Sequence, residues 1–174
     1  AGGGGGVGGG AGGVAGEWGA EVQAVEVFGM PRDGSWTRDS CVSVGTSAGQ
    51  IEVTDWTCNG WAKYDSWQRY DAVPAAIAQR LGLRSREPGL VLEGGSIDVN
   101  GRGALLTTEE CLLSKTQERN PEFTREDYAE IFHKYLGVRK VLWLNRGIAG
   151  DDTHGHVDDL TRFVNPTTVV TVVE

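Results

Sequence analysis

Residues 124–144 read Thr-Arg-Glu-Asp-Tyr-Ala-Glu-Ile-Phe-His-Lys-Tyr-Leu-Gly-Val-Arg-Lys-Val-Leu-Trp-Leu, which predicts a helix followed directly by a strand. Thr124 is a favourable N-cap residue with Asp127 three positions later, a variant of the capping box, and Gly137 is a stop signal. Apolar side chains recur at helical spacing and predict a stripe that faces the core: Tyr128, Ile131, Phe132 and Tyr135. The strand is predicted over Val138–Leu144.

The segments before and after this stretch predict strand pairs joined by tight turns. Asn100-Gly101 turns Ile97–Val99 into Ala104–Thr108. The other predicted strands are residues 41–46 paired with Gln50–Trp56 around Ser47-Ala48-Gly49, Val22–Phe28, Leu90–Leu92 and Thr167–Val173. A helix is predicted over Val73–Leu81, with Gly82 as its stop signal. This order favours a repeat of roughly 60 residues, made of hairpin, helix and strand, over parallel βαβ winding, because tight hairpins join several strands.

The composition is that of an ordinary soluble chain. Of the 174 residues, 23% are charged and 39% hydrophobic, which leaves room for one modest domain. The net charge of −8 argues against nucleic acid and anionic membranes as partners and favours a cationic small molecule. No apolar run approaches the roughly 18–20 residues that span a bilayer. Three widely spaced cysteines fit neither a disulfide framework nor a CxxC zinc site, which favours a reducing cytoplasm.

The first residues differ in composition from the rest. Residues 1–16 contain eleven glycines and no charged side chain. Such a segment cannot bury enough apolar surface to offset the entropy lost on ordering. We expect residues 1–20 to be a disordered tail or linker and residues 21–174 to form one domain.

The segment Gly150–Asp159 has the highest density of titratable groups, with two histidines among four aspartates. Such a cluster is costly to desolvate, so a packing role alone is disfavoured. Two interpretations compete. His154, His156 and Asp158 could be metal ligands, or His156 could act as a base while Asp158 binds a cation.

Four segments occur together and in order: Ser35–Ser40 (SWTRDS), Leu92–Ile97 (LEGGSI), Leu105–Leu113 (LLTTEECLL) and Gly150–Asp159 (GDDTHGHVDD). Together they resemble the agmatine deiminase family, the bacterial branch related to porphyromonad-type peptidylarginine deiminase, from about Val22 to Glu174. The resemblance implies an α/β fold that is part of a five-fold pseudosymmetric α/β propeller of ββαβ units around a substrate channel, incomplete here. It also implies hydrolysis of agmatine to N-carbamoylputrescine and ammonia through a covalent cysteine intermediate, without a metal or cofactor.

The resemblance assigns roles to five residues. Asp39 and Asp158 hold the guanidine nitrogens, which suits a planar, permanently charged group with many N–H donors. Glu93 binds the same group and assists proton movement. His156 is the general acid and base that protonates the departing ammonia and then activates water. Trp36 lines the channel and offers a π-face to the cation.

The cysteines depart from the family pattern. The family nucleophile lies near the C-terminus in a glycine-rich segment, Cys111 is not at its position, and Cys41 and Cys58 stand where the family has glycine and an aromatic residue. We therefore expect an internal fragment that is inactive alone, because covalent guanidine chemistry needs a thiolate. The full-length parent is expected in the cytoplasm, with homo-oligomerisation left open. The alternatives are an arginine or peptidyl-arginine deiminase, a metallohydrolase using His154, His156 and Asp158, and a non-catalytic guanidine-binding or scaffold fragment.

Overall fold

The computed structural model describes residues 29–40 and 42–173, and its helices and strands lie within the unit Arg32–Glu174. Three predictions lie outside these residues: the disordered tail over residues 1–20, the domain boundary that follows it, and the strand Val22–Phe28. Cys41 is also outside the description.

The first repeat follows a short helix, α2 (Thr37–Ser40), and begins with an antiparallel hairpin. Its turn is Ala48-Gly49, and both residues have positive φ (49° and 78°), which is the geometry of the two-residue hairpin turn that matches strand twist. Two helices then lead to a third strand that pairs in parallel with the second. The elements are β1 (Ser43–Ser47), β2 (Gln50–Thr54), α3 (Gln68–Asp71), α4 (Val73–Leu81) and β3 (Arg84–Arg86).

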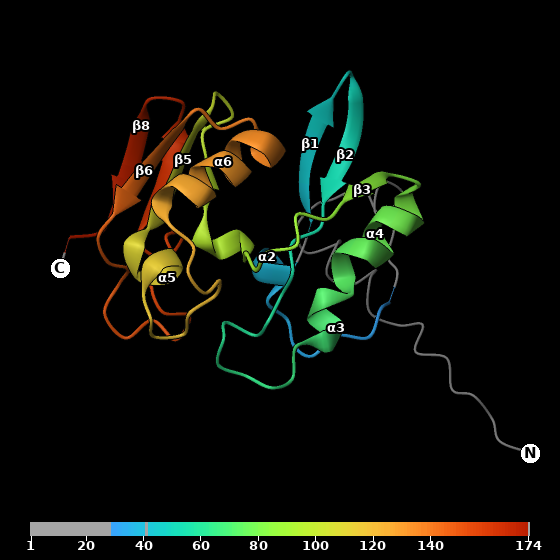
Figure 1. Cartoon of the computed structure of the whole chain (residues 1–174), viewed down its shortest axis with the longest axis horizontal. Helices are drawn as coiled ribbons and strands as arrows, with labels where there is room; N and C mark the ends of the chain where they lie inside the picture. Colours follow the sequence, from blue (N-terminus) through green and yellow to red (C-terminus); the bar gives the residue numbers. More distant parts are fainter. Residues whose placement is uncertain (1–28, 41, 174) are drawn as a thin grey trace, which may run out of the picture. The chain divides into compact units, whose positions relative to one another are not determined.

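The second repeat has the same order (Figure 1). An antiparallel hairpin is followed by two helices and by a strand that pairs in parallel with the second hairpin strand. Its elements are β4 (Asp98–Val99), β5 (Ala104–Thr108), α5 (Glu109–Leu113), α6 (Arg125–Leu136) and β6 (Lys140–Leu144). A third hairpin follows, formed by β7 (Thr161–Asn165) and β8 (Thr168–Thr171).

The spacing of these hairpins confirms the predicted repeat. Their first strands begin at Ser43, Asp98 and Thr161, so the intervals are 55 and 63 residues. The sequence favoured hairpins over parallel strand pairs, and this prediction describes only part of the sheets. Each of the first two repeats contains one antiparallel pair and one parallel pair. The described residues thus form a mixed α/β fold of three small sheets.

One predicted strand was wrong, and one strand was missed. Leu90–Leu92 is not a regular strand, since only Val91 pairs, in a single parallel bridge with Thr57. The predicted strand Thr167–Val173 is confirmed as β8, but its partner β7 was not predicted. The two strands form a hairpin because the chain turns at Pro166, which has no N–H to donate to a strand ladder. The Asn165 side chain accepts the backbone N–H of Thr167 and fixes this turn.

Helix α6 forms as its sequence predicts. Thr124 and Asp127 make the reciprocal hydrogen bonds of a capping box, and Gly137 ends the helix in the left-handed conformation at φ 66°. Gly82 ends α4 in the same way at φ 62°. Within the described ranges, no helix is long and apolar enough to cross a membrane.

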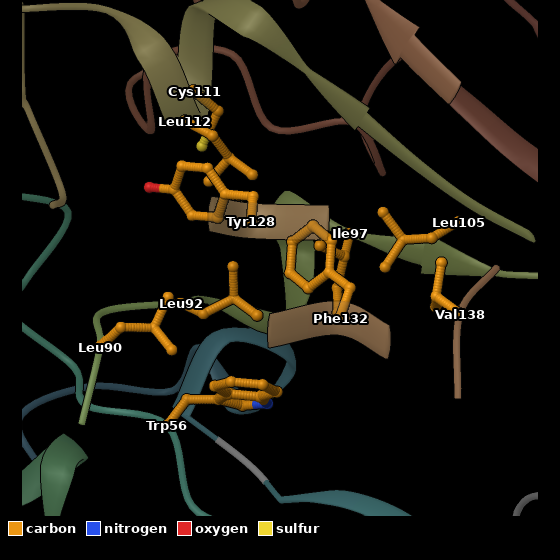
Figure 2. Packing of buried hydrophobic residues seen from close by; sticks show 10 residues of the cluster. All are labelled: Trp56, Leu90, Leu92, Ile97, Leu105, Cys111, Leu112, Tyr128, Phe132 and Val138. Carbon is orange, nitrogen blue, oxygen red and sulfur yellow. The ribbon is translucent and has the colours of Figure 1, made fainter. Parts of the chain in front are cut away.

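The main hydrophobic core lies between α6 and the segments that lead into the second sheet (Figure 2). Tyr128 and Phe132 are fully buried, while Ile131 and Tyr135 pack against the cluster, so the predicted stripe is confirmed. Figure 2 shows Tyr128 between Leu92 and the pair Cys111 and Leu112. The remaining buried members are Trp56, Leu90, Ile97, Leu105 and Val138. This core fixes Leu92 directly before the polar residues described below.

Replacing Phe132 by alanine is expected to lower the free energy of unfolding by about 3–5 kcal/mol, because a fully buried aromatic ring is lost and a cavity remains. Denaturant-induced unfolding followed by circular dichroism measures the change. The control is Leu81→Ala at the 56% exposed end of α4, where a change within about 0.5 kcal/mol is expected. Equal effects of the two substitutions would contradict the assignment of α6 to the core.

Candidate active site

The candidate site lies beside α2, where the consecutive glycines Gly94 and Gly95 allow a turn to approach this helix closely. Glu93 precedes the short 3₁₀ helix η2 (Gly94–Ser96), and Leu92 anchors it in the core. A Cβ at Gly94 would lie 2.1 Å from the backbone oxygen of Arg38, so no larger residue fits there without movement of the backbone. The Gly-Gly pair therefore permits the close approach of η2 to α2.

Gly95 lies at the centre of the polar cluster. A Cβ there would lie 2.5 Å from His156 Nδ1, 2.6 Å from Asp39 Oδ1 and 3.0 Å from Asp158 Oδ1. Its backbone also joins two of these residues, because its N–H donates to Asp39 Oδ1 (3.0 Å) and its carbonyl accepts the N–H of Asp158 (3.2 Å). A glycine is needed at this position because three functional side chains converge on it.

Three carboxylates surround one buried imidazole. His156 Nδ1 lies 3.7 Å from Asp39 Oδ1 and 3.9 Å from Asp158 Oδ1, while its Nε2 lies 3.7 Å from Glu93 Oε2. These four residues come from α2, from the turn before η2 and from the loop after β6. The structure thus brings together four of the five side chains predicted from the sequence.

Trp36, the fifth predicted side chain, lies directly before α2 and is 64% exposed. Among the described residues, its indole makes no ring contact and no cation–π contact. Its role as a wall of the site stays a prediction.

The loop that carries His156 is shaped by Asp151. One carboxylate oxygen accepts the backbone N–H groups of Gly155 and His156, both at 3.0 Å, and the other accepts the N–H of Thr153 at 2.8 Å. Burial raises the pKa of Asp151, but the hydrogen bonds outweigh it and leave the pKa below its usual value. The anionic form therefore holds this loop, and Thr108 fixes it further by donating to the Gly155 carbonyl.

Asp39 has a partner that the sequence did not reveal. The indole N–H of buried Trp61 donates to Asp39 Oδ2 at 3.1 Å. Burial, assisted by the nearby charge of Glu93, raises the pKa of Asp39 above its usual value, against the opposing effect of His156. The carboxylate therefore gains by binding a further cation.

Glu93 is fully buried and paired with a fully buried arginine. Arg119 Nε lies 3.1 Å from Glu93 Oε1 and 3.4 Å from Oε2. Burial raises the pKa of Glu93, but the charges of His156 and Arg119 lower it more, so the pKa is below its usual value. Glu93 is consequently an anion at neutral pH.

Asp158 is the most accessible of the three carboxylates. Its side chain is 18% exposed, and its Oδ2 lies 3.8 Å from Arg38 Nε. This contact is long and half-exposed, so it adds little stability. Asp158 is therefore available to a ligand that approaches from solvent.

His156 itself is buried with an unsatisfied nitrogen. Within the described part of the chain its Nε2 has no hydrogen-bond partner, since Glu93 stands just beyond hydrogen-bond distance. Burial lowers the pKa of His156, but the negative charges of Glu93 and Asp39 outweigh it and leave the pKa above its usual value. A buried polar atom without a partner is rare and at this place indicates a position for a bound group.

The carboxylates of the site outnumber the arginines that contact them. Asp39, Glu93 and Asp158 face two guanidinium groups, and one of these, that of Arg38, also lies 3.9 Å from Asp98. The site therefore favours a cationic ligand over an anionic one.

The predicted metal ligands do not form a site. His154 hydrogen-bonds Ser114 and does not belong to any group of three ligand residues within 4.8 Å in the described chain. The one such group is Glu93, Cys111 and His156. A metal there would have to displace Arg119 from Glu93 and deprotonate Cys111, whose thiol pKa is raised by burial. This donor set does not fit a metal centre.

A family model described as Porphyromonas-type peptidyl-arginine deiminase matches residues 14–174. The chain belongs to this family. The agmatine deiminase of Ectopseudomonas mendocina is 41% identical over 141 residues, a match that covers 77% of this chain and 38% of that protein. This result confirms the resemblance carried by the four sequence segments.

Solved structures of the family agree. The agmatine deiminase of Enterococcus faecalis superposes with a TM-score of 0.78 at 38% identity, over 83% of this chain and 41% of that one. A cysteine-to-serine variant of the C. jejuni agmatine deiminase, with substrate bound, gives 0.79 at 29% identity, over 87% and 45%. The chain therefore shares their mixed α/β fold over the matched length, and it spans less than half the length of these relatives.

Sequence reasoning missed two site residues of this family member. Arg119 stands between Glu118 and Asn120, where an isolated arginine looks like an ordinary surface residue. Trp61 is one of six tryptophans and carries no local signal.

His156 is expected to titrate above the ordinary imidazole value of 6.5 in the folded chain. Because the folded-state pKa is raised, protonation of His156 stabilises the fold. This contribution is fully present below the unfolded-state pKa and is lost as pH rises through the folded-state pKa. NMR titration of the imidazole C–H resonance measures it, with His156→Asn to assign the signal. Titration below 6.5 would contradict the proposed influence of the carboxylates.

Gly95→Ala is expected to push His156 and Asp39 apart and to lower the free energy of unfolding by roughly 1–3 kcal/mol, as overpacking does. The elevated pKa of His156 should fall toward its ordinary value. The matched control is Gly45→Ala in β1, where an added Cβ meets no atom within 4 Å. If Gly95→Ala left the His156 titration unchanged, the described convergence on Gly95 would be wrong.

Proposed function

We propose that this chain forms the guanidine-binding and proton-transfer part of an agmatine deiminase, which converts agmatine and water into N-carbamoylputrescine and ammonia. The observation that carries the proposal is the ring of Asp39, Glu93 and Asp158, each within 4 Å of His156. The names of the relatives in E. mendocina and E. faecalis support agmatine as the substrate. Because the chain spans less than half of these relatives, the proposal concerns the complete protein.

The geometry suits a guanidinium group. This cation is planar and offers several N–H donors, and carboxylates accept pairs of these donors in nearly parallel geometry. Asp39 and Asp158 lie on the same side of Gly95, so they are placed to accept from neighbouring nitrogens. Glu93 accepts from the inner side, beside His156.

His156 supplies the proton transfer in this proposal. A thiolate attacks the guanidine carbon and forms a C–S bond, and a C–N bond breaks as His156 protonates the departing ammonia. The neutral imidazole then takes a proton from water, which adds to the same carbon and releases the ureido product and the thiolate. Imidazole can both donate and accept a proton near neutral pH, and the carboxylates around His156 stabilise its protonated form, which is the form that protonates ammonia.

The thiolate is proposed to come from elsewhere in the complete protein. Burial raises the pKa of Cys58 to about 11 and also raises the pKa of Cys111, and both thiols are buried. Neither is a poised nucleophile. The substrate-bound C. jejuni structure is a cysteine-to-serine variant, which agrees with a cysteine being required for turnover.

The repeated hairpin, helix and strand units support a propeller in the complete protein. Each of the first two repeats adds its last strand in parallel to its hairpin, and β7–β8 begin a third repeat. We propose that these units belong to the five-fold α/β propeller that the sequence resemblance implies. The cytoplasmic location and a homo-oligomeric parent stay predictions.

The alternative substrates are arginine and peptidyl-arginine, since the matching family is described by the latter. Arginine carries a carboxylate beside its free amine, and peptidyl-arginine carries peptide groups in place of the free amine of agmatine. Arg38 and Arg119 already contact Asp158 and Glu93, so neither is placed to receive a substrate carboxylate. This observation favours agmatine over free arginine.

Isothermal titration calorimetry tests the proposal on the 174-residue chain with agmatine, arginine and an N-acetylated arginine amide. We expect agmatine to bind best and to release no ammonia. Asp158→Asn should weaken agmatine binding roughly ten- to a hundred-fold, since one charge-assisted interaction of about 1.5–3 kcal/mol is lost at a partly exposed site. Asp65→Asn on the exposed loop before α3 is the control.

Two outcomes would contradict the proposal. Equal binding of agmatine by the parental chain and by Asp158→Asn would show that the Asp158 carboxylate does not bind the guanidinium group. Ammonia release by this chain, abolished by replacing Cys41, Cys58 or Cys111, would show that the nucleophile lies within it.

A further inference from the structure

Arg119 is a buried cation that contacts both Glu93 and the loop of His156. Its side chain is fully inaccessible, as is that of Glu93. Its Nε donates to the two oxygens of Glu93, its Nη1 donates to the Gln117 carbonyl at 2.9 Å, and its Nη2 donates to the Thr153 carbonyl. The guanidinium therefore links the turn before η2 to the loop that carries His156.

The loop of Arg119 is itself fixed to the segment that carries Glu93. The side chain of Asn120 accepts the N–H of Val91 at 2.9 Å and donates to the Val91 carbonyl at 2.8 Å. The same amide donates to the hydroxyl of Tyr128 in the core. Arg119 is thus held on both sides and has little freedom to leave Glu93.

We propose that Arg119 is a positioning residue that keeps Glu93 anionic and aimed at the side of His156 where the guanidine group binds. The inference deepens the proposed function and rests on it for the meaning of the bound cation. Arg119 does not touch substrate in this proposal; it acts through Glu93.

The protonation state of Glu93 decides what it can bind. An ionised carboxylate only accepts hydrogen bonds, whereas a protonated one presents an O–H donor. A guanidinium presents only N–H donors. The O–H of a protonated Glu93 would therefore point at another donor, and no hydrogen bond would form between the two. Burial without a partner cation would favour the protonated form, and Arg119 prevents this.

Arginine suits this task better than lysine. Its planar fork donates to Glu93 and to two carbonyls in different directions at the same time. An ammonium could supply the charge but could not reach all three partners in this geometry. We therefore expect Arg119→Lys to keep the ionisation of Glu93 and to lose part of the loop fixation.

The test uses the NMR titration of His156, which faces several charged groups: Glu93, Asp39, Asp158 and Arg119, with the neutral thiol of Cys111 nearby. Arg119 acts on His156 in two opposite ways. Its own charge disfavours imidazolium directly, whereas the anion it maintains on Glu93 favours imidazolium. Removing Arg119 therefore shifts the titration in a direction that shows which effect is larger.

For Arg119→Met we expect the pKa of His156 to fall by about one unit or more, because Glu93 becomes neutral and an opposite charge 3.7 Å away is lost. Arg119→Lys should restore most of the parental value. The matched control is Arg125→Met, which breaks an exposed pair with Glu109 and should leave His156 unchanged. A rise in the His156 pKa in Arg119→Met, or no change, would overturn the inference.

A double-mutant cycle with Glu93→Gln keeps the inference testable if Arg119→Met does not fold, because the double variant leaves no uncompensated buried charge. In Glu93→Gln the anion is already absent, so adding Arg119→Met should leave only the direct effect of the Arg119 charge, and the His156 pKa should stay unchanged or rise. A further fall of the His156 pKa on adding Arg119→Met to Glu93→Gln would show that Arg119 acts by a route other than Glu93 and would contradict the inference.

Agmatine binding separates this inference from the proposed function. We expect Arg119→Met to weaken agmatine binding at least tenfold and Arg119→Lys to recover it. If the parental chain does not bind agmatine, the proposed function fails, while the direction of the His156 titration still decides whether Arg119 controls Glu93.

Discussion

The buried charge of Glu93 is the constraint on which the rest of the site depends. A carboxylate removed from water needs a cation and further hydrogen bonds, and breaking such a pair on one side costs about 3–5 kcal/mol. Arg119 satisfies Glu93 and in turn requires acceptors, which the loops at Gln117 and Thr153 supply through their carbonyls. One buried ion pair thus determines the paths of two loops, and one of these loops carries His156.

The second constraint is the absence of a side chain at Gly95. The carboxylates of Asp39 and Asp158 reach the same imidazole only because no Cβ occupies the space between them. The backbone of Gly95 uses both of its polar groups to hold these two residues in place. The electrostatics of the site and the local backbone geometry therefore depend on each other, as expected of a preorganised site.

Sequence reasoning predicted the elements whose signals are local. Helix α6 was predicted with its caps because Thr124, Asp127 and Gly137 act within a few residues, and the hairpin around Ala48-Gly49 was predicted from its turn residues. His156, Glu93, Asp39 and Asp158 were found through segments of sequence that resemble a family. Arg119 and Trp61 were missed because their roles arise from contacts 26 and 22 residues away along the chain, with no periodic or turn signal beside them. Strand β8 was predicted from its β-branched residues, whereas its hairpin partner β7 was not.

Cys111 has a consequence beyond its place in the core. It packs with Leu112 and Tyr128 in the hydrophobic core (Figure 2). Its sulfur also lies within 4.8 Å of ligand atoms of Glu93 and His156. The side chain of Cys111 therefore belongs to the hydrophobic core and also borders the polar site. Because protein interiors are close-packed, a change in the volume of residue 111 would shift the imidazole of His156. Stability and chemistry cannot vary independently here, and the residues acceptable at position 111 are limited by both requirements at once.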